Sequence, residues 1–412
     1  MLAAGNTRGL AVALTQAALP SQPHLPAPVA VPSPLLRACF ALCVANALLF
    51  PLASLQHIWI YDAQGYGQPV DFVGIWSAGK LVLSGHAVQA YDWDIHKQVE
   101  VAALGQDFDG IYGWHYPPPF LFVAALLAQL PYGAAFVAWC AASFVPYAIA
   151  IRAIVGHPVG WLLAAGFPAV VANVFVGHNG FLTAALIGGG LYLLPRRPVL
   201  AGICIGLLTY KPQFGVLFPL ALLVAWQWRV IASATVTALA MAAVSSLAFG
   251  VESWVAFAHW LPRTSHRFLS VGGDIFGKFQ SLYSAVRYFG GGEQLAWMCQ
   301  GALSVVVALA VAWLWRSRAA YDLKAAALAT GTLLVTPYLF VYDMVVLAVA
   351  VAFLVRFGLR EGFRGYELPG LALAGVFILS FVAVTAPVGL LATATVAALI
   401  AARGMSGHAP PR

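Results

Sequence analysis

The feature that most constrains this chain is a series of long apolar runs separated by polar connections. Several runs reach or approach the roughly 20 apolar residues that a helix needs to cross a bilayer. Hydrophobic residues make up 62% of the 412 positions and charged residues 8%, against about 45–50% and about 25% in soluble domains. Backbone exposed to lipid must satisfy its hydrogen bonds internally, so the runs should be helical. The strands of a membrane β-barrel would instead alternate apolar and polar residues, whereas these runs are continuously apolar. We predict an all-α polytopic membrane protein with about 11–13 spans, at 38–60, 118–131, 134–151, 158–176, 179–195, 198–210, 212–226, 230–250, 295–315, 325–341, 344–355, 368–385 and 387–402.

The charged residues predict which ends of the spans share a side. Residues 61–115 and 251–294 form the only long connections and hold ten of the fourteen acidic residues. Short connections carry the basic residues, which is the signature of cytoplasmic loops. We therefore place both long loops outside and attribute the net charge of +7 to topology, with no nucleic-acid partner expected. The basic residues in question are Arg152, Arg196, Arg197, Arg229, Arg316, Arg318, Lys324, Arg356, Arg360, Arg364 and Arg403.

The domain organisation follows from the same pattern. Residues 1–35 are rich in Pro, Ala and Ser and lack the basic start of a signal peptide, so we expect a disordered cytoplasmic tail. Residues 36–405 form one transmembrane domain, and 406–412 form a C-terminal tail. We expect the protein in the cell (inner) membrane, with any active site on the extracytoplasmic side.

One part of this topology conflicts with the count of apolar runs. With Tyr61 outside and Arg196 inside, an odd number of crossings must separate them, yet four apolar runs lie between. One run must therefore be broken, re-entrant or interfacial. The weakest pair surrounds Pro168, Asn173 and the polar turn 178–180, and we expect this turn near the outer face because irregular backbone is tolerated only inside protein or facing water.

Motifs for several common chemistries are missing from the sequence. The five cysteines all fall in apolar runs, and their spacing fits neither a zinc site nor a disulfide framework. The sequence also lacks a P-loop, a Gly-x-Gly-x-x-Gly fingerprint and a His-Glu-x-x-His zinc motif. We expect no metal and no cofactor.

Asp71 is the candidate catalytic group. It follows the first apolar run closely, where a carboxylate at the mouth of the bundle could act as general base on a sugar hydroxyl. The alternative is one more solvated loop acid. Three prolines, 117–119, fix the backbone after His115 and Tyr116, so these side chains should lie near the loop carboxylates, although a structural bend with interfacial aromatics explains them too.

Ionisable residues at the outer ends of other runs are candidates for binding. Lys211 lies between two apolar runs, where it could bind a phosphate oxygen or extend to the interface. Arg263, His266 and Arg267 lie within five residues of loop 251–294 and could bind an anion or anionic lipid headgroups. Asp343 ends a span and would either orient one of these cations or bind substrate.

These motifs occur in an order that resembles glycosyltransferase family 87. The ordered set is Asp71-Phe72, Ala78-Gly79, Gly85, Tyr91-Asp92, Tyr116-Pro117-Pro118, Gly177-His178-Asn179-Gly180, Thr209-Tyr210-Lys211-Pro212-Gln213, Gln280-Ser281 and Tyr342-Asp343. The resemblance covers about residues 70–345, and the chain has Gly177-His178 where the family usually has Gly-Gln.

The resemblance implies a GT-C-type helix bundle and an inverting, metal-independent transferase. Its donor would be a polyprenyl-phosphate sugar, with mannose as the expected hexose, and its acceptor a lipid or glycan. Membrane lipids would be further partners. Asp71 would occupy the position of the catalytic base. We expect donor-phosphate binding at Lys211, Arg263, Arg267 and His178, and substrate binding at His115, Tyr116, Asn179, His266, Gln280 and Asp343.

Two other functions remain compatible with the sequence. A secondary transporter would also have about a dozen helices, although it would usually carry internal repeats and ionisable residues at the membrane midplane. A non-catalytic lipid- or glycolipid-binding protein would need only the apolar and basic surfaces. Loss of Asp71 would leave the function of such a protein intact.

Overall fold

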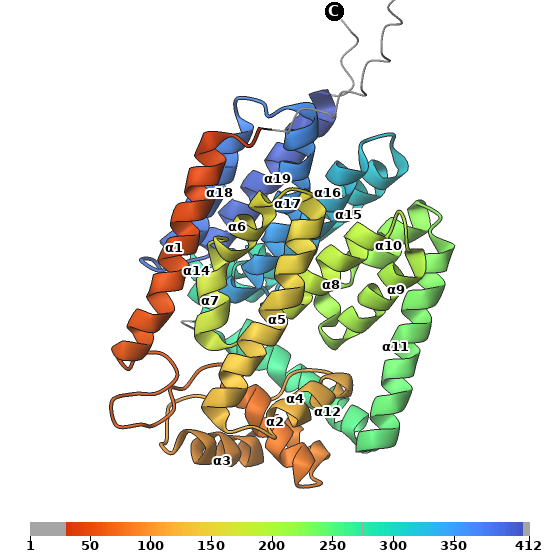
Figure 1. Ribbon diagram of the computed structural model, residues 1–412. Coiled ribbons are helices and arrows are strands. Elements are labelled where there is room, and N and C mark those ends of the chain that lie inside the picture. Colours follow the sequence, from red (N-terminus) through yellow and green to blue (C-terminus); the bar gives the residue numbers. More distant parts are fainter. Residues whose placement is uncertain (1–29, 274, 407–412) are drawn as a thin grey trace, which may run out of the picture. The chain divides into compact units, whose positions relative to one another are not determined.

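The computed structural model describes residues 30–273 and 275–406. Within these ranges the chain forms helices and loops, with only two isolated β-bridges (Figure 1). Helix α1 begins at Ser33, so the predicted tail is shorter than 35 residues. Residues 1–29 of that tail and 407–412 of the C-terminal tail lie outside the described residues.

Six helical segments in the described part are long and apolar enough to cross a membrane. They are α1 (Ser33–Leu55), α5 (Tyr132–Val155), α11 (Trp228–Phe249), α15 (Glu293–Arg316), η6 with α17 (Val341–Val346 and Leu347–Glu361), and α19 (Val388–Ser406). These helices confirm a polytopic membrane protein. Their number is below the 11–13 spans expected from the apolar runs.

The other apolar runs form shorter helices. At about 1.5 Å per residue these helices are shorter than the bilayer core of about 30 Å. They are α4 (Leu121–Leu127, preceded by η2, Pro118–Phe120), α6 (Val159–Ala165), α7 (Ala169–Val176), α8 (Gly180–Leu193), α9 (Pro198–Leu207, continued by η3, Leu208–Tyr210), α10 (Leu217–Val224, preceded by η4, Pro212–Phe214), α16 (Tyr321–Val335) and α18 (Glu367–Ser380).

Helix α17 is the core of the bundle. Every residue from Leu347 to Val355 is buried, and the helix contacts α5, α8, α16 and α19. The outer helices α1, α11 and α15 instead expose large apolar side chains such as Leu247 and Trp313. Exposed apolar faces of this length are suited to lipid rather than water.

The four apolar runs between residues 116 and 196 do not each form a span. The expected break near Pro168 is confirmed, because α6 and α7 are bent by 51° there. Segment η2–α4 has only ten residues and packs against α2 (Phe72–Leu83), so it does not cross. Helix α5 is long enough to cross, and the bent pair is a candidate for one further span, whereas α8 with 14 residues is too short to cross alone.

The two long connections fold into short helices that pack against each other. Loop 61–115 forms α2, η1 (Ala87–Tyr91) and α3 (Trp93–Leu104), and loop 251–294 forms α12 (Glu252–Ser265), the π-helical η5 (His266–Val271), α13 (Ile275–Lys278) and α14 (Leu282–Tyr288). The rings of Trp93 and Trp260 lie 5.5 Å apart, and those of Tyr91 and Phe257 6.1 Å. Both connections therefore lie at the same end of the bundle, where Figure 1 draws α2, α3 and α12 together.

A close helix contact sets the position of α2. A Cβ atom at Gly79 would lie 2.0 Å from the backbone oxygen of Ala124 in α4, so only glycine allows the two backbones to approach this far. Because Asp71 is the N-cap of α2, this contact also positions the candidate catalytic carboxylate.

Candidate active site

Asp71 lies partly buried at the start of α2. Its side chain does not cap the helix, and no described side chain forms an ion pair or hydrogen bond with it. Burial raises the pKa of Asp71 to about 6, and the nearby negative charge of Asp343 adds to this effect. The positive charges of Lys278 and Lys211 partly offset it. A carboxylate with these properties is still mostly ionised near neutral pH and is a stronger base than a solvated aspartate.

Lys211 and Asp343 form a buried ion pair beside Asp71. The Lys211 Nζ lies 2.5 Å from Asp343 Oδ1 and donates a second hydrogen bond of 2.9 Å to Asn179 Oδ1. The Lys211 and Asp343 side chains are 5% and 1% exposed. Lys211 therefore does not extend to the interface, and its charge is already neutralised within the protein.

The His178 side chain contacts two tyrosines, Tyr116 and Tyr342. The Tyr116 hydroxyl lies 2.9 Å from His178 Nε2, and the His178 ring stacks on Tyr342 with centroids 3.8 Å apart. The amide of Asn173, in its favoured orientation, donates to the His178 carbonyl and accepts from the Gly180 amide. The turn 178–180 is thus fixed at the end of the bundle that carries the long connections.

Five of the expected site residues are therefore in one place. The structure brings together Tyr116, His178, Asn179, Lys211 and Asp343, which come from four separate segments. The electrostatic effect of Lys211 and Asp343 on Asp71 connects this cluster to the candidate base.

The remaining expected residues belong to the two long connections. His115 contacts the second long connection through Thr264 Oγ1, 3.2 Å from its Nδ1, and burial lowers its pKa to about 4. Arg263, His266 and Arg267 are exposed, and the Arg263 guanidinium lies over the Trp260 ring at 4.6 Å. Among the described residues, no hydrogen bond or ion pair joins these three to Lys211 or Asp343.

The buried Gln280 side chain forms hydrogen bonds with backbone groups of the protein. Its Oε1 accepts a hydrogen bond of 2.7 Å from the Gly389 amide, and its Nε2 donates one of 3.0 Å to the Lys278 carbonyl. The side chain is fully buried. Gln280 therefore joins α13 to the start of α19 and fixes the backbone of Lys278.

Three further residues of this region were given no site role from the sequence. Lys278 is an exposed cation whose charge acts on Asp71, and the only sequence signal for it was a basic residue two positions before Gln280. His96 and Glu100 form a buried pair, with Nε2 and Oε1 3.5 Å apart, and burial raises the pKa of Glu100 to about 7. Glu100 had been grouped with the loop acids.

Several buried polar atoms of the site have no hydrogen-bond partner among the described residues. They include Asn179 Nδ2, His178 Nδ1 and His115 Nε2. Such groups are uncommon in folded proteins, and a bound ligand is one way to satisfy them. No three His, Cys, Asp or Glu side chains of the described ranges are arranged to hold a metal ion.

Comparison with known proteins identifies the family of the chain. The model of glycosyltransferase family 87 matches residues 114–337. The matched segment is shorter than the expected 70–345 and includes Tyr116, His178, Asn179 and Lys211, but neither Asp71 nor Asp343. No curated protein and no solved structure is significantly similar to the chain. Because the match covers more than half of the chain, the protein belongs to glycosyltransferase family 87 and is a multi-pass membrane glycosyltransferase.

Proposed function

We propose that this protein transfers a hexose, with mannose as the first candidate, from a polyprenyl-phosphate donor to a lipid or glycan acceptor on the outer face of the cell membrane. The observation that carries the proposal is Asp71, a partly buried carboxylate with a pKa of about 6 beside a buried cluster of polar groups. Nearby cations and the surrounding lipid are suited to a donor that has one phosphate and an isoprenoid tail.

The reaction is a direct displacement at the anomeric carbon. Asp71 takes the proton of the acceptor hydroxyl as that oxygen forms a bond to the anomeric carbon. The bond between the anomeric carbon and the phosphate oxygen breaks, and its electron pair leaves with the polyprenyl phosphate. One displacement of this kind inverts the anomeric configuration, whereas retention would require a second carboxylate as nucleophile.

Cations near Asp71 would stabilise the charge that develops on the departing phosphate, which is usually the largest electrostatic contribution to catalysis. Lys278 is exposed and acts on Asp71, and Arg263 and Arg267 are exposed on the same connection. Lys211 already binds Asp343 and Asn179. We therefore assign the phosphate mainly to Lys278, Arg263 and Arg267, and keep Lys211 as a contact that requires loosening of the ion pair.

The polar atoms without partners suggest where the sugars lie. Asn179 Nδ2 and His178 Nδ1 are buried in the cluster and would bind hydroxyl groups of the donor hexose, next to Tyr116 and Asp343. His115 and His266 lie on the side of the second connection and would contact the acceptor.

The experiment is a donor panel with the purified protein. Polyprenyl-phosphate mannose and glucose are compared with a nucleotide sugar, each with and without chelator. We expect release of polyprenyl phosphate and formation of an inverted glycoside, with unchanged rate in chelator. Transfer from the nucleotide sugar alone would refute the donor class, and retention of configuration would refute the mechanism.

Phosphate binding by Lys278 is tested separately. Replacing Lys278 by Gln should weaken donor binding by about 1.5–3 kcal/mol, the usual value of a hydrogen bond to a charged group. Lys80→Gln is the matched control, because Lys80 is also exposed and lies near the other end of α2, over Trp76. Equal donor affinity in both variants would remove Lys278 from the phosphate site.

A further inference from the structure

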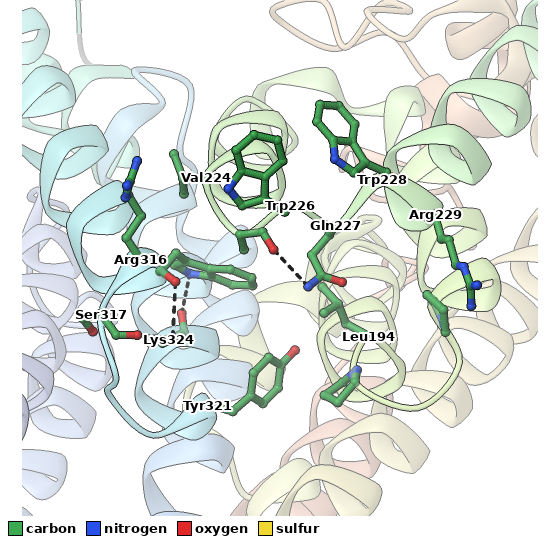
Figure 2. A pocket seen from close by; sticks show the side chains of 14 residues that line it. Leu194, Val224, Trp226, Gln227, Trp228, Arg229, Arg316, Ser317, Tyr321 and Lys324 are labelled. Carbon is green, nitrogen blue, oxygen red and sulfur yellow. Dashed lines mark hydrogen bonds between the residues drawn. The ribbon is translucent and has the colours of Figure 1, made fainter.

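A cavity of about 910 Å³ lies away from Asp71, among three helix-connecting turns. These turns join α8 to α9, α10 to α11 and α15 to α16, and the charged lining residues lie at the last two. Figure 2 shows Trp226, Gln227 and Tyr321 between Arg316 on one side and Arg229 on the other. None of its lining residues belongs to the site described above.

The cavity lies at the membrane face opposite the two long connections. Helix α11 begins at the cavity with Trp228 and ends at Phe249, whose ring lies 4.5 Å from Phe122 beside the first connection. Helix α15 begins at Glu293, which accepts a hydrogen bond from Ser270 of the second connection, and ends at the cavity with Arg316. Each helix has at least 22 residues and is therefore about 33 Å long or more, enough to separate the two faces.

The lining of the cavity is positively charged. Arg229, Arg316 and Lys324 line it, and none of its lining residues is acidic. Neither arginine has a carboxylate partner in the described part of the chain. The nearest acid along the chain, Asp322, is buried and already paired with Arg356 and Arg360. The two guanidinium groups therefore retain their charge and their hydrogen-bond donors.

The lining also contains exposed tryptophans, which are typical of the interface between lipid and water. Trp226 is 72% exposed and Trp228 53% exposed, and tryptophan is enriched at the level of lipid headgroups. Trp226 has a φ of 55°, which is uncommon for a bulky residue. Hydrogen bonds from the amides of Trp226 and Gln227 to Leu223 and Leu222 hold this backbone conformation.

Lys324 makes the turn between α15 and α16 rigid. Its ammonium donates to the carbonyls of Trp315 and Ser317 at 3.2 and 2.7 Å, and Trp315 Nε1 donates to the Lys324 carbonyl at 3.0 Å. The cavity wall next to Arg316 is therefore fixed before any ligand binds, which lowers the entropic cost of binding.

We infer that this cavity binds the phosphate headgroup of an anionic glycerophospholipid from the leaflet opposite the transfer site. Basic pockets between transmembrane helices bind such headgroups, and the volume of about 910 Å³ is within the usual range for small-molecule sites. Arg229 and Arg316 bind the phosphate oxygens, and the exposed tryptophans pack against the glycerol and the upper acyl chains. The inference does not depend on the identity of the sugar donor.

Native mass spectrometry in neutral detergent tests the inference, because detergent removes the surface potential of the bilayer. Phosphatidylglycerol, phosphatidylcholine and inorganic phosphate are titrated separately. The parent protein should bind phosphatidylglycerol at least about tenfold more tightly than phosphatidylcholine. The double variant Arg229→Gln/Arg316→Gln should lose about 10- to 30-fold in affinity for phosphatidylglycerol.

Arg196→Gln/Arg318→Gln is the matched control, since both arginines are exposed and neither lines the cavity. It should bind phosphatidylglycerol like the parent. An equal loss in both double variants, equal binding of the two lipids, or tight binding of inorganic phosphate alone would overturn the inference. If the Gln variant unfolds, Arg229→Lys/Arg316→Lys keeps the charge and should bind phosphatidylglycerol in a salt-dependent manner, and its failure to bind while folded would overturn the assigned site.

Discussion

Removing one partner of the buried pair between Lys211 and Asp343 should destabilise the protein strongly. The two side chains are 5% and 1% exposed, and the pair is 2.5 Å long. Breaking a buried pair leaves an unpaired charge and typically costs about 3–5 kcal/mol. We expect losses in this range for Lys211→Met and for Asp343→Asn, because Asn179 offers Lys211 only a neutral acceptor.

The double variant identifies the origin of the loss. Lys211→Met/Asp343→Asn removes both charges, so its loss should be smaller than the sum of the single losses by about 2–3 kcal/mol. The free energy of unfolding in detergent micelles is the measurement. Arg360→Gln is the control, because Arg360 is 67% exposed and its 3.7 Å pair with Asp322 should contribute no more than about 1 kcal/mol. Single losses below about 1 kcal/mol, or additive losses, would refute the reasoning.

Three further predictions concern the site and its position. The pKa of Asp71 is raised to about 6, so the base is protonated below that pH. The value of kcat/KM should therefore rise with pH to a plateau above about 7. A flat profile from pH 5 to 8 would contradict this prediction. Gly79→Ala should lower the free energy of unfolding by more than about 1 kcal/mol and reduce transfer by displacing α2. Gly301→Ala is the control and should be neutral or stabilising, because no atom lies within 4 Å of the new Cβ. Equal melting temperatures of the two variants would argue against the tight contact at Gly79. Cysteines placed at the exposed positions 107 and 252 should react with an impermeant reagent in intact cells, and one at exposed Arg318 only after membrane disruption; any other pattern would contradict the assigned topology.

The positions of the helices could be predicted well, but the number of spans could not. The runs 134–151 and 295–315 correspond to α5 and α15 within a few residues. Hydropathy cannot distinguish an apolar helix that faces lipid from one that is buried in protein. Helix α8 and segment η2–α4 are apolar because they pack inside the molecule, and counting such segments as spans gave too high a number.

The members of the site could be predicted better than their contacts. Motif order identified Tyr116, Lys211 and Asp343 as candidates, and the structure brings them together. Lys211 and Asp343 are 132 positions apart, so no local spacing could show that they neutralise each other. Lys278 was given no site role for the same reason, because its effect on Asp71 depends on how the second long connection folds back.

Transfer by the Asp71→Asn variant tests the central claim most directly. The substitution keeps the size of the side chain and removes the proton acceptor, so transfer at pH 8 should fall about 10²- to 10⁴-fold, while folding and donor binding remain. Asp71→Glu should recover little, because the added methylene displaces the carboxylate. Asp109→Asn, at an exposed position of the same connection, should transfer sugar like the parent. Transfer by folded Asp71→Asn protein at close to the parent rate would contradict the assignment of Asp71 as the general base.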